Sequence, residues 1–220
     1  AAGFDRYFQI ARCFRDEDLR ADRQPEFTQI DIEASFVTPE DIMKWVEGLM
    51  VALSRHFPDV ETTAPFDVIT FAEAMERFGS DRPDLRYSLE IEDWTSALQN
   101  CGSNILMAAV GEGGRIRAIV VKDGSQLSRK HLDQLQQEVK EGGSKGLLWV
   151  KRTEEGGSGP LSNHMGAETY AALGMEPGDL ALVSAGPDNI TSTTLSIARS
   201  SVIRRLKIKK EKSHAWLWVI

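Results

Sequence analysis

Two segments near the start of the chain alternate between apolar and polar residues, which is the period of a β-strand with one buried face. They cover residues 7–14 and 27–36, and the alternation is nearly complete in the second. Because successive side chains of a strand point to opposite faces, we expect the apolar face of 27–36 to pack on helices and its polar face to meet solvent or a ligand. The polar face carries Phe27, Gln29, Asp31, Glu33 and Ser35, and the apolar face carries Thr28, Ile30, Ile32, Ala34 and Phe36.

Helical periods follow the two strands. Residues 38–41 (Thr-Pro-Glu-Asp) combine an N-cap, a proline at the first helical position and an acid at the third, ahead of apolar residues at helical spacing as far as Leu53. Residues 70–73 form a second capping box, and we expect its helix to stop at Gly79. The polar residues 80–84, which include a proline, predict a linker and are the best candidate for a domain boundary.

From about residue 89 the pattern becomes that of a small α+β unit. Two apolar runs, 105–110 and 116–121, flank the glycine-rich residues 111–114 and predict a β-hairpin, with the glycines as its turn rather than a phosphate loop. An apolar, strand-like run at 216–220 and the strand near the start favour a piece of a larger fold, because chains usually end in polar segments. The other predicted elements are a helix from Ser128 to Lys140, strands at 147–150 and 180–185, a short helix at 167–173, and a long helix at 189–207 with Leu195, Ala198, Val202, Ile203 and Leu206 on its inner face.

Composition places the chain among globular proteins. Its 220 residues (24.5 kDa) fit one large domain or two small ones, and 41% hydrophobic with 27% charged residues exclude disorder, collagen and coiled coil as descriptions of the whole. The net charge of -7 argues against a general nucleic-acid coat and leaves a local basic patch open. No apolar run is long enough to span a bilayer and no secretory signal opens the chain, so we expect a cytoplasmic protein with no membrane partner. Because Cys13 and Cys101 lack a CxxC partner, we expect both to be free thiols.

The richest chemistry lies in the charged connection between the first two strands, residues 15–26. A hairpin needs only about two to five residues to turn, so this connection is either a solvated excursion or a binding loop, and charge alone favours the solvated loop. By the alternation of the first strand, Arg15 lies on the face that would adjoin Gln29. A guanidinium there could bind two oxygens of a phosphate or carboxylate. Arg23 and Phe27, at the start of the return strand, add a cation and a ring that can stack on a base.

These residues also form a recognisable string. Phe14-Arg15-Asp16-Glu17, a loop, and Arg23-Gln24-Pro25-Glu26-Phe27 resemble motif 2 of the class II aminoacyl-tRNA synthetases, whose pattern is Phe-Arg-x-Glu, a loop and Arg-x-x-x-Phe. Residues 12–31 as a whole are similar to the bacterial-type aspartyl-tRNA synthetases. Further on, residues 70–75 and 79–86 resemble the segment ahead of that family's inserted GAD domain, and residues 216–220 resemble the strand by which the chain returns to the catalytic sheet.

The resemblance implies an α+β fold: part of the class II synthetase antiparallel sheet with flanking helices, plus an inserted small α+β domain like the GAD domain. It divides the chain into a catalytic-core fragment with motif 2 (1–88), a GAD-like insertion domain (89–186), and the return helix and strand of the core (187–220). Within the insertion, residues 127–130 and 145–147 match best.

By the same resemblance, the hairpin would bind ATP and aspartate. Arg15 would be the catalytic residue, since a guanidinium on the ATP α-phosphate and the aspartate carboxylate stabilises charge that develops as the carboxylate attacks phosphorus. Phe27 would stack on adenine, Glu17 would also lie near the tRNA acceptor end, and Gln29 and Asp31 would lie by the ammonium group of aspartate. The implied ATP contacts are Arg15, Asp16, Glu17, Gln24 and Phe27, and the implied aspartate contacts are Arg15, Gln29 and Asp31.

The implied activity is that of an aspartate-tRNA ligase, with ATP, magnesium, L-aspartate and tRNA as cofactors and partners and a homodimer as the state of the full-length parent. Motif 1, the Gln-x-Phe-Lys and His-His-Pro-Phe segments, motif 3 (Gly-Leu-Asp-Arg) and the anticodon-binding barrel are absent from the sequence. We therefore expect a ligase fragment that is inactive alone, because one wall of the site is missing. A non-catalytic tRNA- or protein-binding module derived from the synthetase is the alternative, and an incomplete piece with no activity of its own is a third interpretation.

Two other signals concern metals and nucleic acid. His56, His131, His164 and His214 lack zinc-ligand spacing, so no metal bound by protein side chains is expected. A basic run near the end of the long helix could contact RNA phosphates, but cations at a helix C-terminus also stabilise its dipole, and that interpretation is slightly favoured. The run consists of Arg199, Arg204, Arg205, Lys207, Lys209, Lys210 and Lys212.

Overall fold

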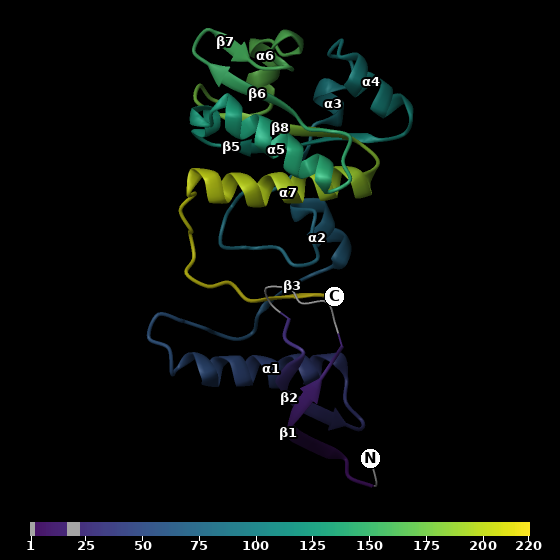
Figure 1. Cartoon of the computed structure of the whole chain (residues 1–220), viewed down its shortest axis with the longest axis vertical. Helices are drawn as coiled ribbons and strands as arrows, with labels where there is room; N and C mark the ends of the chain where they lie inside the picture. Colours follow the sequence, from purple (N-terminus) through teal and green to yellow (C-terminus); the bar gives the residue numbers. More distant parts are fainter. Residues whose placement is uncertain (1–2, 17–22) are drawn as a thin grey trace. The chain divides into compact units, whose positions relative to one another are not determined.

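The computed structural model describes residues 3–16 and 23–220 and divides into two compact units, Ala1–Pro65 and Phe66–Ile220. The described part of the first unit holds a two-stranded sheet and one helix (Figure 1). These elements are β1 (Arg6–Phe14), β2 (Glu26–Ala34) and α1 (Pro39–Ser54).

Strands β1 and β2 form an antiparallel hairpin, as the alternating pattern predicts. Their register runs from Arg6 opposite Ala34 to Phe14 opposite Glu26. Helix α1 then begins at the predicted capping box. The Thr38 hydroxyl accepts a hydrogen bond from the Asp41 amide (3.3 Å), and the Asp41 carboxylate accepts one from the Thr38 amide (3.0 Å). These bonds to Thr38 hold the pKa of the Asp41 carboxyl below its ordinary value, because they stabilise the charged form.

The apolar face of the hairpin does not pack on helices as predicted. Ile30, Ile32 and Phe36 are 52%, 49% and 98% exposed, and Phe8 and Ile10 on the partner strand are exposed as well. Alternation correctly identified which side chains share a face. It could not supply a covering layer, and among the described residues none buries this face.

The second unit is built on a five-stranded sheet in the order β4-β5-β8-β6-β7, with every neighbouring pair antiparallel. Helices cover both of its faces (Figure 1). The strands are β4 (Glu92–Asp93), β5 (Arg115–Val121), β6 (Leu148–Thr153), β7 (Gly156–Ser158) and β8 (Leu180–Gly186). The helices are α2 (Phe71–Phe78), α3 (Thr95–Leu98), α4 (Asn104–Gly111), α5 (Arg129–Glu141), α6 (Ala167–Ala172) and α7 (Asp188–Leu206), with short 3₁₀ turns at Gly124–Gln126 and Ser162–His164.

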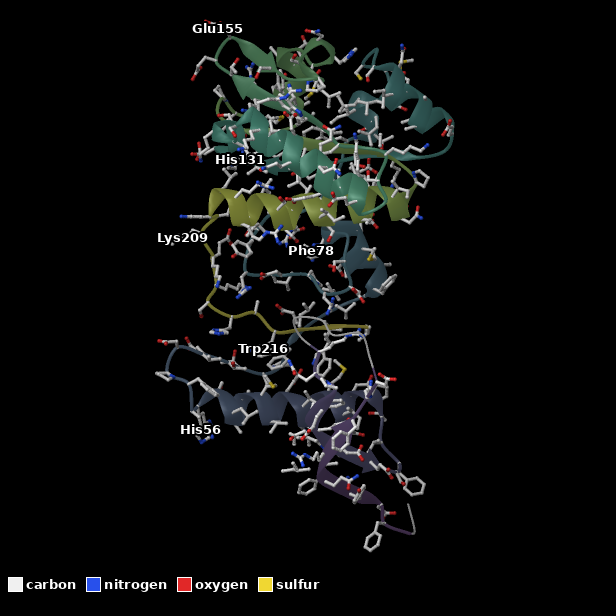
Figure 2. All side chains as sticks on the ribbon, viewed as in Figure 1. His56, Phe78, His131, Glu155, Lys209 and Trp216 are labelled. Atoms are coloured by element: carbon white, nitrogen blue, oxygen red, sulfur yellow. The ribbon has the colours of Figure 1, made fainter. Side chains whose placement is uncertain are left out.

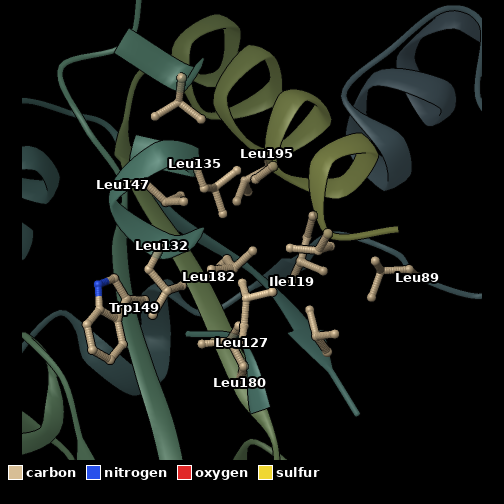
Figure 3. Close-up of a cluster of buried hydrophobic side chains, with 14 of the residues drawn as sticks. Leu89, Ile119, Leu127, Leu132, Leu135, Leu147, Trp149, Leu180, Leu182 and Leu195 are labelled. Carbon is tan, nitrogen blue, oxygen red and sulfur yellow. The ribbon is translucent and has the colours of Figure 1, made fainter. Parts of the chain in front are cut away.

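Two hydrophobic clusters fill the space on either side of this sheet. In β8, Leu180 and Leu182 belong to one cluster while Ala181 and Val183 belong to the other, as the two-residue period of a strand requires. The first cluster lies between the sheet and helices α5 and α7 (Figure 3). Its helical members, each at most 2% exposed, include Leu132, Leu135 and Val139 of α5 and Leu195, Ala198 and Val202 of α7. The predicted inner face of the long helix is therefore confirmed.

The predicted hairpin at 105–121 is wrong. Asn104–Gly111 forms helix α4, Arg115–Val121 forms strand β5, and β5 pairs with β4 and β8 instead. A short apolar run of six residues has no period that separates a strand from a helix, and the residues of this run, rich in Leu, Met and Ala, favour the helix. Ser103 precedes the helix as its N-cap residue, although its side chain makes no capping hydrogen bond.

Helix α2 is bounded as the sequence predicts. The Thr70 hydroxyl accepts a hydrogen bond from the Glu73 amide (3.1 Å), and Gly79 ends the helix in the left-handed region (φ 67°). A Cβ atom at Gly79 would lie 2.2 Å from the Ser192 carbonyl oxygen of α7. Two features therefore require glycine at this position: the left-handed backbone conformation and the close approach of α7.

Two buried arginines connect α2 and the residues after it to the rest of the unit: Arg117 of β5 bonds to α2 and α7, and Arg199 of α7 bonds to the segment after α2. Arg199 is 4% exposed, and its guanidinium donates hydrogen bonds to the carbonyl oxygens of Leu89 (2.6 Å), Asp84 (2.7 Å) and Tyr87 (3.0 Å). Arg117 is 1% exposed and donates to Ser192 Oγ (2.7 Å) and to the last carbonyls of α2. These buried bonds reach Asp84, the last residue of the predicted linker, and they fix chiefly the residues that follow it, as far as Leu89.

Strand β3 (Asp67–Ile69) pairs in parallel with β9 (Leu217–Val219), so the predicted strand at 216–220 is confirmed. The pair is extended by hydrogen bonds from the Ile220 amide to the Ile69 carbonyl (3.0 Å) and from the Phe71 amide to the Ile220 carbonyl (2.7 Å). The chain therefore leaves this strand pair at α2 and returns to it after α7.

Candidate active site

The register of the hairpin gathers the predicted site residues on one face. Phe27 lies opposite Cys13, Gln29 opposite Ala11 and Asp31 opposite Gln9. Because paired residues on antiparallel strands project to the same side, these side chains form one continuous surface.

Arg15 and Phe27 come together where the strands end. The Arg15 amide donates a hydrogen bond to the Pro25 carbonyl (2.9 Å), which extends the ladder by one step past β1. The Arg15 guanidinium carbon lies 5.6 Å from the centroid of the Phe27 ring, within the range of a cation–π contact. A cation and an aromatic face thus lie side by side at the end of the hairpin where the connection between the strands begins.

The other predicted ATP contacts lie beside this pair or outside the described residues. Asp16 follows Arg15 and is exposed, and Gln24 is exposed on the return side of the connection. Glu17, the predicted contact for both ATP and the tRNA acceptor end, lies outside the described residues.

At the middle of the hairpin, Asp31 is joined to a residue that the sequence reasoning did not select. The Gln9 side-chain amide donates a hydrogen bond to Asp31 Oδ2 (2.9 Å), which fixes one carboxylate oxygen. Tyr7 lies one step further along, opposite Glu33. Desolvation and the carboxylates of Asp31 and Glu33 raise the pKa of the Tyr7 hydroxyl above its ordinary value. The alternation that places Arg15 on this face places Tyr7 and Gln9 there as well, although it predicts no role for either.

The opposite face of the hairpin carries a separate ion pair. Arg12 pairs with Glu26 there, across the strands from the surface that holds Arg15 and Asp31. Two arginines only three residues apart therefore have different roles, one paired on the far face and one beside an aromatic ring at the site.

The described residues give limited scope for other chemistry. They contain no group of three or more His, Cys, Asp or Glu side chains that could hold a metal ion. Cys13 and Cys101 are free thiols, as predicted from their spacing. No helix in the described part of the chain has both the length and the apolar character needed to cross a membrane.

Comparison with known proteins identifies the family of this chain. The family model for class II tRNA synthetases (D, K and N) matches residues 1–220. The chain is 43% identical over 225 residues to an aspartate-tRNA ligase from Lactiplantibacillus plantarum, an alignment that covers 100% of this chain and 38% of the relative. It is also 43% identical over 222 residues to an aspartate-tRNA(Asp/Asn) ligase from Bacillus cereus, again covering 38% of that protein. The chain thus spans well under half the length of these relatives, and it belongs to the class II tRNA synthetase family.

Proposed function

We propose that this chain is part of an aspartate-tRNA ligase and supplies the portion of the active site that binds ATP and the aspartate carboxylate. The observation that supports this most directly is the contact of the Arg15 guanidinium with the Phe27 ring, 5.6 Å apart at the connected end of the hairpin. Because the chain covers 38% of its relatives' length, the reaction requires segments beyond these 220 residues. Taken alone, the chain is inactive.

In the proposed reaction, the carboxylate of L-aspartate attacks the α-phosphorus of ATP, pyrophosphate leaves, and the resulting aspartyl-adenylate then transfers aspartate to the 3′ end of tRNA. Arg15 binds the α-phosphate and the attacking carboxylate. Its planar guanidinium can hold two anionic oxygens at once, so it brings two like-charged groups together and stabilises the charge that grows on phosphorus. The hydrogen bond from the Arg15 backbone to Pro25 fixes the point from which that side chain extends.

The remaining hairpin residues orient the two substrates. Phe27 stacks on the adenine ring, and Asp16, Glu17 and Gln24 contact ATP from the connection between the strands, with Glu17 also reaching the tRNA acceptor end. Gln29 and Asp31 bind the ammonium group of aspartate. We add Gln9 as a positioning residue, because its amide holds one Asp31 oxygen at 2.9 Å and so restricts the orientation of the carboxylate that would bind substrate.

The proposal extends to partners and domain limits. Magnesium arrives with the triphosphate as part of the substrate and shields its charge. Residues 1–88 and 187–220 would belong to the catalytic core and 89–186 to a GAD-like insertion. The complete ligase would act as a homodimer in the cytoplasm, with tRNA, L-aspartate and ATP as its partners.

Substitution of Arg15 tests the proposal. In the complete reading frame that encodes residues 1–220, Arg15→Ala should lower aspartate-dependent ATP–pyrophosphate exchange by about 10²- to 10³-fold, because a donor to the developing charge is lost. Arg12→Ala is the matched control, since Arg12 pairs with Glu26 on the opposite face of the same strand, and it should change exchange less than about threefold. Equal losses in the two variants would show that the hairpin merely needs its arginines to fold.

A non-catalytic tRNA-binding module remains the alternative function, favoured by the lysine-rich segment after α7. Under that alternative, the complete reading frame would show no aspartate-dependent exchange with Arg15 intact, and the 220-residue chain would still bind tRNA with a steep dependence on salt.

A further inference from the structure

A short basic segment follows helix α7 and is not accounted for by the site described above. The helix ends at Leu206, and Lys207 caps it in the left-handed region (φ 50°). Lys209, Lys210 and Lys212 lie beyond the last turn, where the helix dipole no longer acts, so stabilisation of the dipole does not explain them. All four lysines are exposed, and none of them makes a side-chain hydrogen bond or ion pair in the part of the chain that the structure describes. Figure 2 labels Lys209 just past the end of α7.

Other members of the predicted basic run have different roles. Arg199 is buried and bonded to backbone carbonyls. Arg205 donates to Gln134 (2.8 Å) and Glu138 (2.5 Å) of α5, and Arg204 lies 3.9 Å from the same Glu138 carboxylate. The structure therefore divides the run: Arg199 and Arg205 are engaged within the fold, whereas Arg204 is largely exposed and the later lysines face solvent.

The lysine segment is held against the residues that follow α2. The Glu211 amide donates a hydrogen bond to the Arg86 carbonyl (2.9 Å), and the Ser88 hydroxyl donates to the Glu211 carboxylate (2.5 Å). These bonds attach the middle of the segment to a second stretch of chain, so its lysines are presented from a fixed backbone.

Next to this attachment is a cavity of about 340 Å³ that has a basic lining. Arg86 is compensated there, because its guanidinium holds both oxygens of Asp84 (2.8 and 2.7 Å). Arg82 is exposed, and its guanidinium has no hydrogen-bond or ion-pair partner within residues 3–16 and 23–220. The cavity is lined by Arg82, Pro83, Asp84, Leu85, Arg86, His214, Ala215 and Trp216.

His214 and Trp216 give this cavity further binding capacity. The Nδ1 atom of His214 is buried and has no hydrogen-bond partner among the described residues. A buried polar atom without a partner costs free energy, and a ligand that supplies a partner recovers it. Trp216, labelled in Figure 2, is 38% exposed and stacks with Phe66 at 6.0 Å between ring centroids, which fixes its indole at the edge of the cavity.

We propose that Arg82, Lys207, Lys209, Lys210 and Lys212, here called the basic strip, bind phosphate groups of an RNA backbone. A row of separate cations fits a polyanion better than it fits one small ion, because each cation can neutralise a different phosphate. The Asp84 carboxylate is already paired with Arg86, and the Glu211 carboxylate accepts a hydrogen bond from Ser88 but keeps its charge. Asp81 adjoins Arg82, and Asp67 and Glu90 line a pocket with Lys212, so the lysines outnumber the carboxylates chiefly at positions 207, 209 and 210. The identification of this RNA as tRNA rests on the function proposed above. Phosphate binding by the basic strip is independent of that function.

Salt-dependent RNA binding tests this proposal on the 220-residue chain. Binding of an aspartate tRNA transcript is measured by filter retention at several KCl concentrations. Arg82→Ala should weaken binding several-fold and lower the slope of log K against log salt by about 1, and the triple variant of Lys209, Lys210 and Lys212 to Ala should weaken it at least tenfold and lower the slope by about 2 to 3.

The matched control removes the same charge elsewhere. Lys130, Lys140 and Lys145 are also exposed lysines, located in and just after α5, and their triple alanine variant should change affinity less than twofold. If the two triple variants lose affinity equally, binding follows overall charge and the proposal is overturned. Circular dichroism of each variant establishes that it is folded.

A second arm separates RNA from free phosphate. Inorganic pyrophosphate is titrated into the same variants by calorimetry. If Arg82→Ala abolishes pyrophosphate binding and leaves tRNA affinity unchanged, the cavity is a site for a small phosphate and the RNA proposal fails. These measurements contain neither ATP nor aspartate, so their outcome is independent of the exchange assay on Arg15, and either proposal can fail without the other.

Discussion

The β1–β2 hairpin and the five-stranded sheet are both antiparallel, but they are stabilised differently. The sheet is covered on both faces, and side chains of β8 such as Leu182 and Val183 are fully buried. The hairpin leaves Ile30 and Ile32 about half exposed, although its alternation is the more regular of the two. The polar face of the hairpin carries the candidate chemistry, whereas the sheet carries the core. A regular pattern therefore identifies a strand without showing how much that strand contributes to stability.

The largest expected difference comes from truncating one leucine of the core. Leu135 is fully buried between α5, α7 and the sheet, so Leu135→Ala should lower the free energy of unfolding by about 2 to 5 kcal/mol. Ile30→Ala on the hairpin is the counterpart and should cost less than about 1 kcal/mol, because half of that side chain already meets solvent. Urea unfolding followed by circular dichroism measures both. Equal costs would mean that the hairpin face is buried in solution.

A somewhat smaller effect is expected at Arg199. Arg199→Met fills similar space but leaves the carbonyls of Asp84, Tyr87 and Leu89 without their donor, at an expected cost of about 3 kcal/mol. The control is Arg204→Met on the same helix, whose side chain is 73% exposed, with an expected cost below about 0.5 kcal/mol.

Hydrogen exchange shows where the Arg199 effect is located. Amides of residues 84–91 should exchange faster in Arg199→Met while those of β8 remain protected. Uniform acceleration across the sheet would contradict an anchoring role confined to this segment.

The smallest effect concerns pH. Two hydrogen bonds from Arg115 (2.6 and 2.9 Å) and the charge of Arg117 hold the pKa of Glu76 below its ordinary value. A lowered pKa contributes stability at pH values above the ordinary one, and that contribution is lost as pH falls through the lowered value. Because the Glu76 side chain is 47% exposed, the contribution should stay under about 1 kcal/mol.

The corresponding measurement is unfolding free energy between neutral and acid pH. Glu76→Gln should be slightly less stable than the parent at neutral pH, and the difference should vanish toward acid pH. Glu112→Gln, at an exposed carboxylate with no ion pair in the described part of the chain, should follow the parent at every pH. A difference between Glu76→Gln and the parent that persists in acid would mean that the charge of Glu76 is not its source.

Local signals predicted much of this fold. The caps at Thr38 and Thr70, the stop at Gly79 and the shared parity of Arg15 and Asp31 all depend on neighbours a few residues away, so the sequence displays them directly. The string around Arg15 also identified the family before any geometry was known.

What could not be predicted depends on distant parts of the chain. Arg117 only interrupts an apolar run in the sequence, and its burial follows from the approach of α2 and α7. The sequence places Arg199 in a basic run, and its charge gives no indication that backbone carbonyls of residues 84–89 surround it. The run at 105–110 was assigned to a strand because six apolar residues fit either element, and tertiary packing decides between them.

The parallel pairing of β3 with β9 has a consequence for the order of folding. Val68 and Trp218 are neighbours although about 150 residues separate them, so their contact closes a very long loop. Closing such a loop in an unfolded chain costs entropy that three residues of pairing cannot offset. Once the sheet, α2 and α7 have folded, the two strands are brought together at no further loop cost. We therefore expect β3 and β9 to pair after the residues between them have folded. The number of residues between the two strands could change greatly, provided that the folded segment still brings its two ends together.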